Sequence, residues 1–98
     1  MQPRGESVNA FIEERRQEVH RLVEGALLHL GIREYSVSVT RRRRVNPHSL
    51  GTPIFAVKAW AKRPVTDEEI EFIRGCLMNR GYHVHRLTQK NGSIYMLI

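Results

Sequence analysis

The clearest chemical signal in this sequence is a run of four arginines, Arg41, Arg42, Arg43 and Arg44. Each guanidinium group is permanently charged and presents a planar set of N–H donors that matches the oxygens of a phosphate. Glu34 is the nearest acidic residue along the chain, and one carboxylate cannot neutralise four arginines. The run therefore predicts a contact with a polyanion such as RNA or DNA. An acidic protein partner and an ordinary solvated surface are the alternatives.

The net charge of +6 lies almost entirely in the middle of the chain. Residues 33–63 contain eight lysines or arginines and one glutamate, a balance of +7. Residues 1–32 carry −1, from four arginines and five glutamates, and residues 64–98 are balanced. Because binding to phosphates depends on clustered cations, the middle segment is the predicted binding surface.

Lys58, Trp60 and Lys62 alternate along a predicted strand and therefore share one face of it. On a sheet face open to water, an aromatic ring between two cations can act as a platform on which a base stacks. The alternatives are that Trp60 packs against Tyr95 or Leu97, or that a homodimer buries it. The remaining candidates for nucleic-acid contact are Arg63, Arg86 and Lys90.

Catalytic and cofactor-binding motifs are absent from the sequence, which has no phosphate-binding glycine loop, no His-Glu-x-x-His and no nucleophile elbow. His83 and His85 fall on one side of a predicted strand, but a zinc site needs at least three protein ligands. Cys76 lies on the apolar side of a predicted helix, where a small core residue is expected rather than a nucleophile. We therefore predict no enzyme activity, no metal and no cofactor.

Length and composition predict a single folded domain over residues 1–98, with a disordered N-terminal tail over residues 1–6. Apolar residues make up 41% of the chain and charged residues 27%, which is typical of globular proteins. No apolar stretch approaches the ~20 residues that cross a membrane. The absence of a signal-peptide core and the presence of a single cysteine favour the cytoplasm.

Two helices are predicted from the spacing of apolar residues and from their end signals. Apolar residues three and four apart predict a helix from Ser7 to Leu30, which Gly31 would end. Thr66 and Glu69 form a capping box, in which each side chain accepts a backbone N–H at the start of a helix. The second helix therefore begins after Thr66 and ends before Gly81.

Four strands are predicted, in two hairpins. Alternating apolar and polar residues predict strands over Tyr35 to Thr40 and Ile54 to Ala61, joined by a long loop. Strands over Tyr82 to Thr88 and Ser93 to Ile98 flank Asn91-Gly92, the strongest short signal for a hairpin.

The register of the last hairpin has two possible values. A two-residue turn at Asn91-Gly92 sets Leu87 opposite Met96, whereas a three-residue loop sets Arg86 there. Only the two-residue turn places Arg86 on the open face of the sheet, so the turn decides whether Arg86 belongs to the basic surface.

These elements predict an α+β fold, a two-layer sandwich with the order αββαββ. The expected sheet order is first, second, fourth, third, with both helices on one face, which is a circularly permuted form of the ferredoxin-like layout. An offset of fifty residues relates the halves, because Gly25 and Gly31 correspond to Gly75 and Gly81. This pseudo-repeat predicts close packing at the two helix glycines.

Two functions are compatible with these patterns. The first is a small non-enzymatic nucleic-acid-binding domain that uses the basic hairpin and an adjoining sheet face with Trp60. The second is a protein-interaction module, such as a small regulator or inhibitor, that docks on an acidic protein or forms a homodimer through the open sheet.

Overall fold

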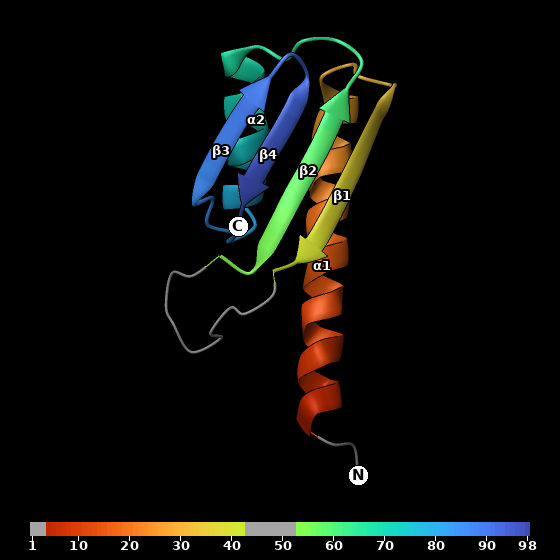
Figure 1. The fold of residues 1–98 in the computed structure, drawn as a ribbon, viewed down its shortest axis with the longest axis vertical. Coiled ribbons are helices and arrows are strands. Elements are labelled where there is room, and N and C mark those ends of the chain that lie inside the picture. Colours follow the sequence, from red (N-terminus) through yellow and green to blue (C-terminus); the bar gives the residue numbers. More distant parts are fainter. Residues whose placement is uncertain (1–3, 43–52) are drawn as a thin grey trace.

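The computed structural model describes residues 4–42 and 53–98 and shows two helices and four strands (Figure 1). The predicted α+β class is therefore confirmed. Two of the predicted arginines, Arg43 and Arg44, lie outside the described residues. In chain order the elements are α1 (Arg4–His29), β1 (Tyr35–Arg41), β2 (Phe55–Ala61), α2 (Asp67–Met78), β3 (Arg86–Lys90) and β4 (Ser93–Leu97).

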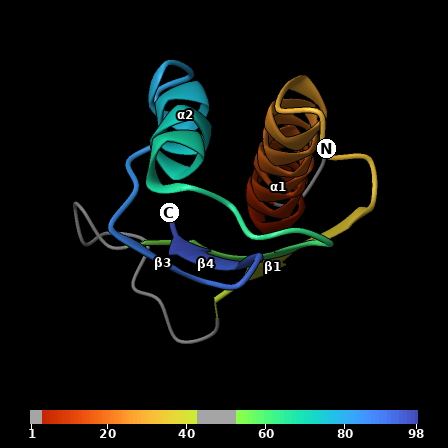
Figure 2. The same cartoon turned by 90° about the horizontal axis from the view of Figure 1, so that it is seen from above.

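The four strands form one antiparallel sheet in the order β1-β2-β4-β3, as predicted from the sequence. Both helices cover the same face of this sheet, which makes two layers (Figure 2). The other face carries no helix formed by the described residues 4–42 and 53–98, and we call it the open face. The predicted pseudo-repeat and the circular permutation stay predictions.

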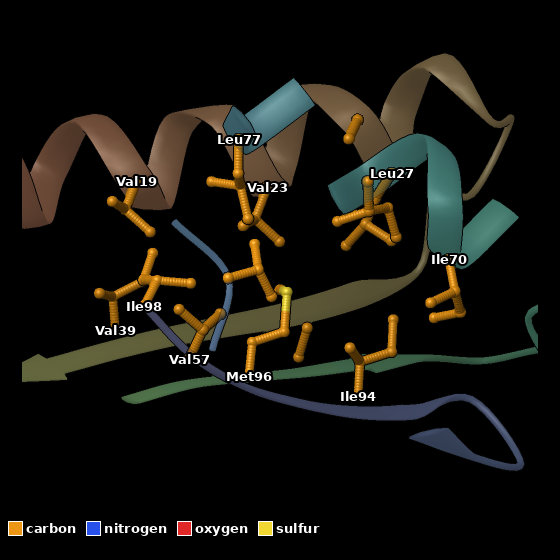
Figure 3. Close-up of a cluster of buried hydrophobic side chains, with 14 of the residues drawn as sticks. Val19, Val23, Leu27, Val39, Val57, Ile70, Leu77, Ile94, Met96 and Ile98 are labelled. Atoms are coloured by element: carbon orange, nitrogen blue, oxygen red, sulfur yellow. The ribbon is translucent and has the colours of Figure 1, made fainter. Parts of the chain in front are cut away.

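The core lies between the helix layer and the sheet. Val23 and Leu27 of α1 and Leu77 of α2 are fully buried, and they point toward the sheet residues Val57 and Met96 (Figure 3). Burying a side chain of this size contributes about 1.5–3 kcal/mol. These contacts fix the helices on one face and leave the alternate strand residues on the other.

Helix α1 begins at Arg4, so residues 4–6, which were expected in an N-terminal tail, are helical. Its N-terminal part extends beyond the end of the sheet (Figure 1). Along the described ranges 4–42 and 53–98, neither helix is long and apolar enough to cross a membrane.

The helix ends follow the local signals in the sequence. Gly31 adopts φ +80°, its N–H donates to the Leu28 carbonyl at 3.0 Å, and the Ile32 N–H donates to the Leu27 carbonyl at 3.0 Å. Such a reversal satisfies carbonyls that the helix leaves unpaired, and buried Ile32 supplies its hydrophobic contact. The predicted end of the first helix at Gly31 is confirmed.

Strand β3 starts at Arg86, four residues later than the strand predicted from Tyr82. The Tyr82 N–H is still used at the helix end, where it donates to the Leu77 carbonyl at 3.1 Å. Val84 then enters the core, and pairing with β4 begins only where the His85 N–H donates to the Leu97 carbonyl at 2.8 Å. The connection from α2 to the sheet edge therefore uses the first four residues of the predicted strand.

The helix glycines Gly25 and Gly75 do not sit at a close contact, contrary to the prediction. A Cβ built on either glycine would meet nothing within 4 Å. The matching glycines therefore give no evidence of equivalent close packing in the two halves.

Candidate nucleic-acid interface

The strand registers arrange the open face as three rows that cross all four strands. Each row takes one residue from β1, β2, β4 and β3 in turn, and its members are directly paired neighbours. The upper row is Ser36, Trp60, Ser93 and Lys90, the middle row is Ser38, Lys58, Tyr95 and Thr88, and the lower row is Thr40, Ala56, Leu97 and Arg86.

These twelve described positions include three cations and no carboxylate. Lys58, Arg86 and Lys90 are all exposed to solvent. Trp60 and Tyr95 bring two aromatic rings to the central strands β2 and β4. A shallow hollow of about 490 Å³ lies over the upper and middle rows, lined by residues of all four strands. The open face therefore combines positive charge with aromatic surface.

Trp60 is 46% exposed, although it stands on a central strand. Its directly paired neighbours are Ser36 on β1 and Ser93 on β4, and neither is long enough to cover an indole ring. Tyr95 is the diagonal neighbour in the next row, and it is half-buried. The small serines thus leave the indole accessible from the open face.

The turn between β3 and β4 decides which residues of β3 reach the open face. Asn91 and Gly92 adopt φ 50° and 90°, the positive values of a two-residue type I′ turn. Leu87 is paired with Met96, and Arg86 with Leu97. The two-residue alternative is therefore confirmed, and it places Arg86 on the open face.

The arginine run begins at the end of the sheet far from Trp60. Arg41 is paired with Phe55, five residues before Trp60 on β2, which is roughly 17 Å at about 3.3–3.4 Å per residue. Arg42 is half-buried, and its Nη1 donates to the Pro53 carbonyl at 3.0 Å. The described part of the run therefore lies at the lower end of the sheet instead of adjoining Trp60, and strand alternation sets Arg41 on the helix-covered face with Val39 and Phe55.

Lys62 and Arg63, both predicted contact residues, take part in ion pairs. Lys62 Nζ lies 2.8 Å from a carboxylate oxygen of Glu34, and both side chains are well exposed. Arg63 donates to both carboxylate oxygens of Glu69, at 2.9 and 2.6 Å, and to the Leu30 carbonyl at 3.1 Å. Arg63 thus ties the end of β2 to both helices, and we leave it out of the proposed binding surface.

The capping box at the start of α2 is formed as predicted. The Glu69 N–H donates to Thr66 Oγ1 at 3.2 Å, and the Thr66 N–H donates to Glu69 Oε1 at 3.0 Å. Hydrogen bonds from the Arg63 guanidinium, and next from the Thr66 backbone, lower the pKa of the Glu69 carboxyl to about 2.

Folding stability should fall in acid because Glu69 has a lower pKa in the folded chain than its ordinary value of 4.5. The stabilisation is complete above pH 4.5 and is lost as the pH falls toward about 2. Because solvent screens this partly exposed pair, we expect it to contribute about 1–2 kcal/mol to the free energy of unfolding. Urea unfolding between these pH values measures the free energy of unfolding, which should change less steeply with pH for Glu69→Gln than for the unchanged protein. The exposed neighbour Glu68→Gln controls for charge removal, and equal slopes for all three proteins would contradict the prediction.

His83 and His85, which were predicted to fall on one side of a strand, lie just before β3 and contact each other. The rings of His83 and His85 meet edge to face, with centroids 4.5 Å apart. Desolvation, and then the charges of His83 and Arg42, lower the pKa of the His85 imidazole. No group of three or more potential metal ligands occurs among the residues that the structure describes. Cys76 is half-buried against the core.

Sequence analysis considered Tyr95 only as a side chain that could cover Trp60, and it did not count Tyr95 or Ser93 among the contact residues of the open face. Tyr95 and Ser93 join Trp60 there because β4 pairs with β2, a contact between segments more than thirty residues apart in sequence. The strand alternation and the Asn91-Gly92 turn could have assigned both residues to this face once the two-residue turn was chosen.

Comparison with known proteins adds no relative: no family model matches the chain, and no curated protein or solved structure matches it.

Proposed function

We propose that this protein is a small non-enzymatic nucleic-acid-binding domain whose binding surface is the open face of its sheet. The composition of this face carries the proposal: three cations, two aromatic rings and no carboxylate occupy its twelve positions. Surface charges of both signs are usually interspersed, so these twelve positions favour an anionic partner. Glu34, which lies beyond the upper row, is paired with Lys62.

The placement of the cations supports a phosphate backbone as that partner. Lys90, Lys58 and Arg86 fall in the upper, middle and lower rows respectively, so positive charge extends along the whole face. Arg42 follows β1 at the lower end, where the arginine run begins. A backbone with phosphates at regular intervals can contact such a series of cations, and each contact releases a counterion.

The proposal predicts that binding depends on three particular cations. The variant with Lys58→Gln, Arg86→Gln and Lys90→Gln should lose affinity for nucleic acid. The slope of its log binding constant against log salt concentration should become shallower by about 2–3, which is the contribution of three phosphate contacts. Fluorescence anisotropy of a labelled oligonucleotide, measured between about 50 and about 200 mM salt, gives both quantities.

A matched control removes the same charge elsewhere. Arg21, Arg33 and Arg80 are exposed and lie outside the strands. Changing these three to Gln lowers the net charge equally and should leave most of the affinity and the salt slope intact. If both triple variants lost affinity equally, or if the unchanged protein bound no nucleic acid at low salt, the proposal would be wrong.

The same face could receive an acidic protein or a second copy of the chain. Capture from cell extract with and without nuclease separates these outcomes. Loss of capture after nuclease treatment supports nucleic-acid binding. A defined acidic protein that stays bound through Lys58, Arg86 and Lys90 after nuclease treatment would instead support the interaction module.

A further inference from the structure

We infer that the nucleic acid bound by the open face is single-stranded and that one of its unstacked bases lies on the indole of Trp60. This inference rests on the proposed function and adds the class of nucleic acid to it. It covers single strands of RNA and of DNA, because both present a base with a flat π-face beside a phosphate.

The first support is the access to the indole. Trp60 is 46% exposed and lines the hollow of about 490 Å³, between the two serines with which it is paired. Stacking requires one uncovered ring face, and small neighbours on both adjacent strands provide it. Because the hollow is open, a base can reach the ring without movement of the backbone.

The second support is the position of the cations around the indole. Lys58 is two residues away on the same strand, roughly 7 Å along β2. Lys90 is in the same row as Trp60 but two strands away, roughly 10 Å across the sheet. A base on Trp60 thus leaves the phosphates on its two sides within reach of one lysine each.

The third support is that a duplex cannot use this arrangement in full. Its bases are stacked on each other and paired, so the indole would gain a partner only if a base were flipped out at a cost. A duplex would contact Lys58, Arg86 and Lys90 through phosphates and leave Trp60 in water. A single strand satisfies both the cations and the aromatic ring.

The test compares oligonucleotides of about ten nucleotides as single-stranded RNA, single-stranded DNA and duplex DNA of the same sequence. Trp60→Leu removes the π-face but keeps an apolar side chain, and it should weaken single-strand binding roughly 5- to 150-fold. Duplex binding should change less than about twofold. Trp60→Phe should recover most of the single-strand affinity. The RNA and DNA arms show which single strand is preferred.

Two further measurements keep the test independent of folding. Phe72→Leu changes another exposed aromatic, on α2 in the helix layer, and should leave all affinities unchanged. Trp60 is the only tryptophan, so its fluorescence in the unchanged protein should be quenched by a single strand and hardly by a duplex. Circular dichroism checks that the variants are folded.

Each contrary result has a distinct meaning. Equal effects of Trp60→Leu on single strand and duplex, or no effect on either, would overturn the inference while leaving the proposed function intact. If the three-cation variant also kept full affinity, the proposed function itself would fail. Fluorescence that changed with protein concentration and not with oligonucleotide would indicate a homodimer over Trp60, and it would likewise overturn the inference.

Discussion

Replacing Gly92 with alanine should lower the free energy of unfolding by about 3–5 kcal/mol. A Cβ at this position would lie 2.5 Å from the Ala61 carbonyl oxygen and 2.7 Å from the Arg63 carbonyl oxygen. Both obstacles are backbone atoms, so no side-chain rotation removes the clash. The φ of 90° adds strain of about 1–2 kcal/mol for any L side chain.

The same substitution at two other glycines separates these causes. Gly31 has φ +80° and nothing within 4 Å of a Cβ, so Gly31→Ala should cost only the strain of about 1–2 kcal/mol. Gly25 lies inside α1 in open space, so Gly25→Ala should stabilise the fold by about 0.5–1 kcal/mol. Denaturant unfolding of the three variants measures the series. Equal losses of unfolding free energy for Gly92→Ala and Gly31→Ala would contradict the close approach of the Ala61 and Arg63 carbonyl oxygens to Gly92.

The clash at Gly92 also bears on the binding surface. The Ala61 N–H donates to the Gly92 carbonyl at 2.8 Å, so the turn is bonded to the end of β2, next to Trp60. Displacing the turn moves Lys90, which precedes Asn91. We therefore expect Gly92→Ala to affect both stability and the upper row of the open face.

Leu77→Ala in α2 should cost about 2–5 kcal/mol of unfolding free energy, a large part of the 5–15 kcal/mol typical of a domain. Leu77 is fully buried between the helix layer and the sheet (Figure 3). Its truncation removes apolar contacts and leaves a cavity that rigid neighbours fill only in part. Thermal or urea unfolding followed by circular dichroism measures the loss.

The adjacent residue provides the control for Leu77. Met78 is in the same helix but 51% exposed, so Met78→Ala should change stability by less than about 0.5 kcal/mol. Both substitutions alter helix propensity little, so the difference between them reports burial. If Met78→Ala lowered the free energy of unfolding as much as Leu77→Ala, the orientation of α2 in the structure would be contradicted, because Met78 is then as buried as Leu77.

Local signals in the sequence determined where the second helix begins and where both helices end. The Thr66 and Glu69 capping box and the reversal at Gly31 depend on residues three to five positions apart, which are close in any folded form of the chain. The alternation along β2 likewise assigned Lys58 and Trp60 to one face, because the strand period of two is a backbone property.

The composition of the candidate binding surface was decided by tertiary structure. Tyr95 stands beside Trp60 only because β2 pairs with β4, and Arg86 reaches the open face only because a two-residue turn lets Leu87 pack with Met96. The pairing of β2 with β4 joins distant segments, and strand register is selected by which arrangement buries the most apolar surface. The Asn91-Gly92 pair favours the two-residue turn, but no pattern within β2 or β4 alone specifies that these two strands pair.

The arginine run and Arg63 also show which properties the sequence determines and which only the tertiary structure decides. The sequence alone determined that positive charge is concentrated in residues 33–63. Only the tertiary structure separated Arg41 from Trp60 by the length of β2 and engaged Arg63 with Glu69. The physical reason is that charge belongs to residue types, whereas the partner and position of each charge depend on how strands and helices from distant parts of the chain are packed together.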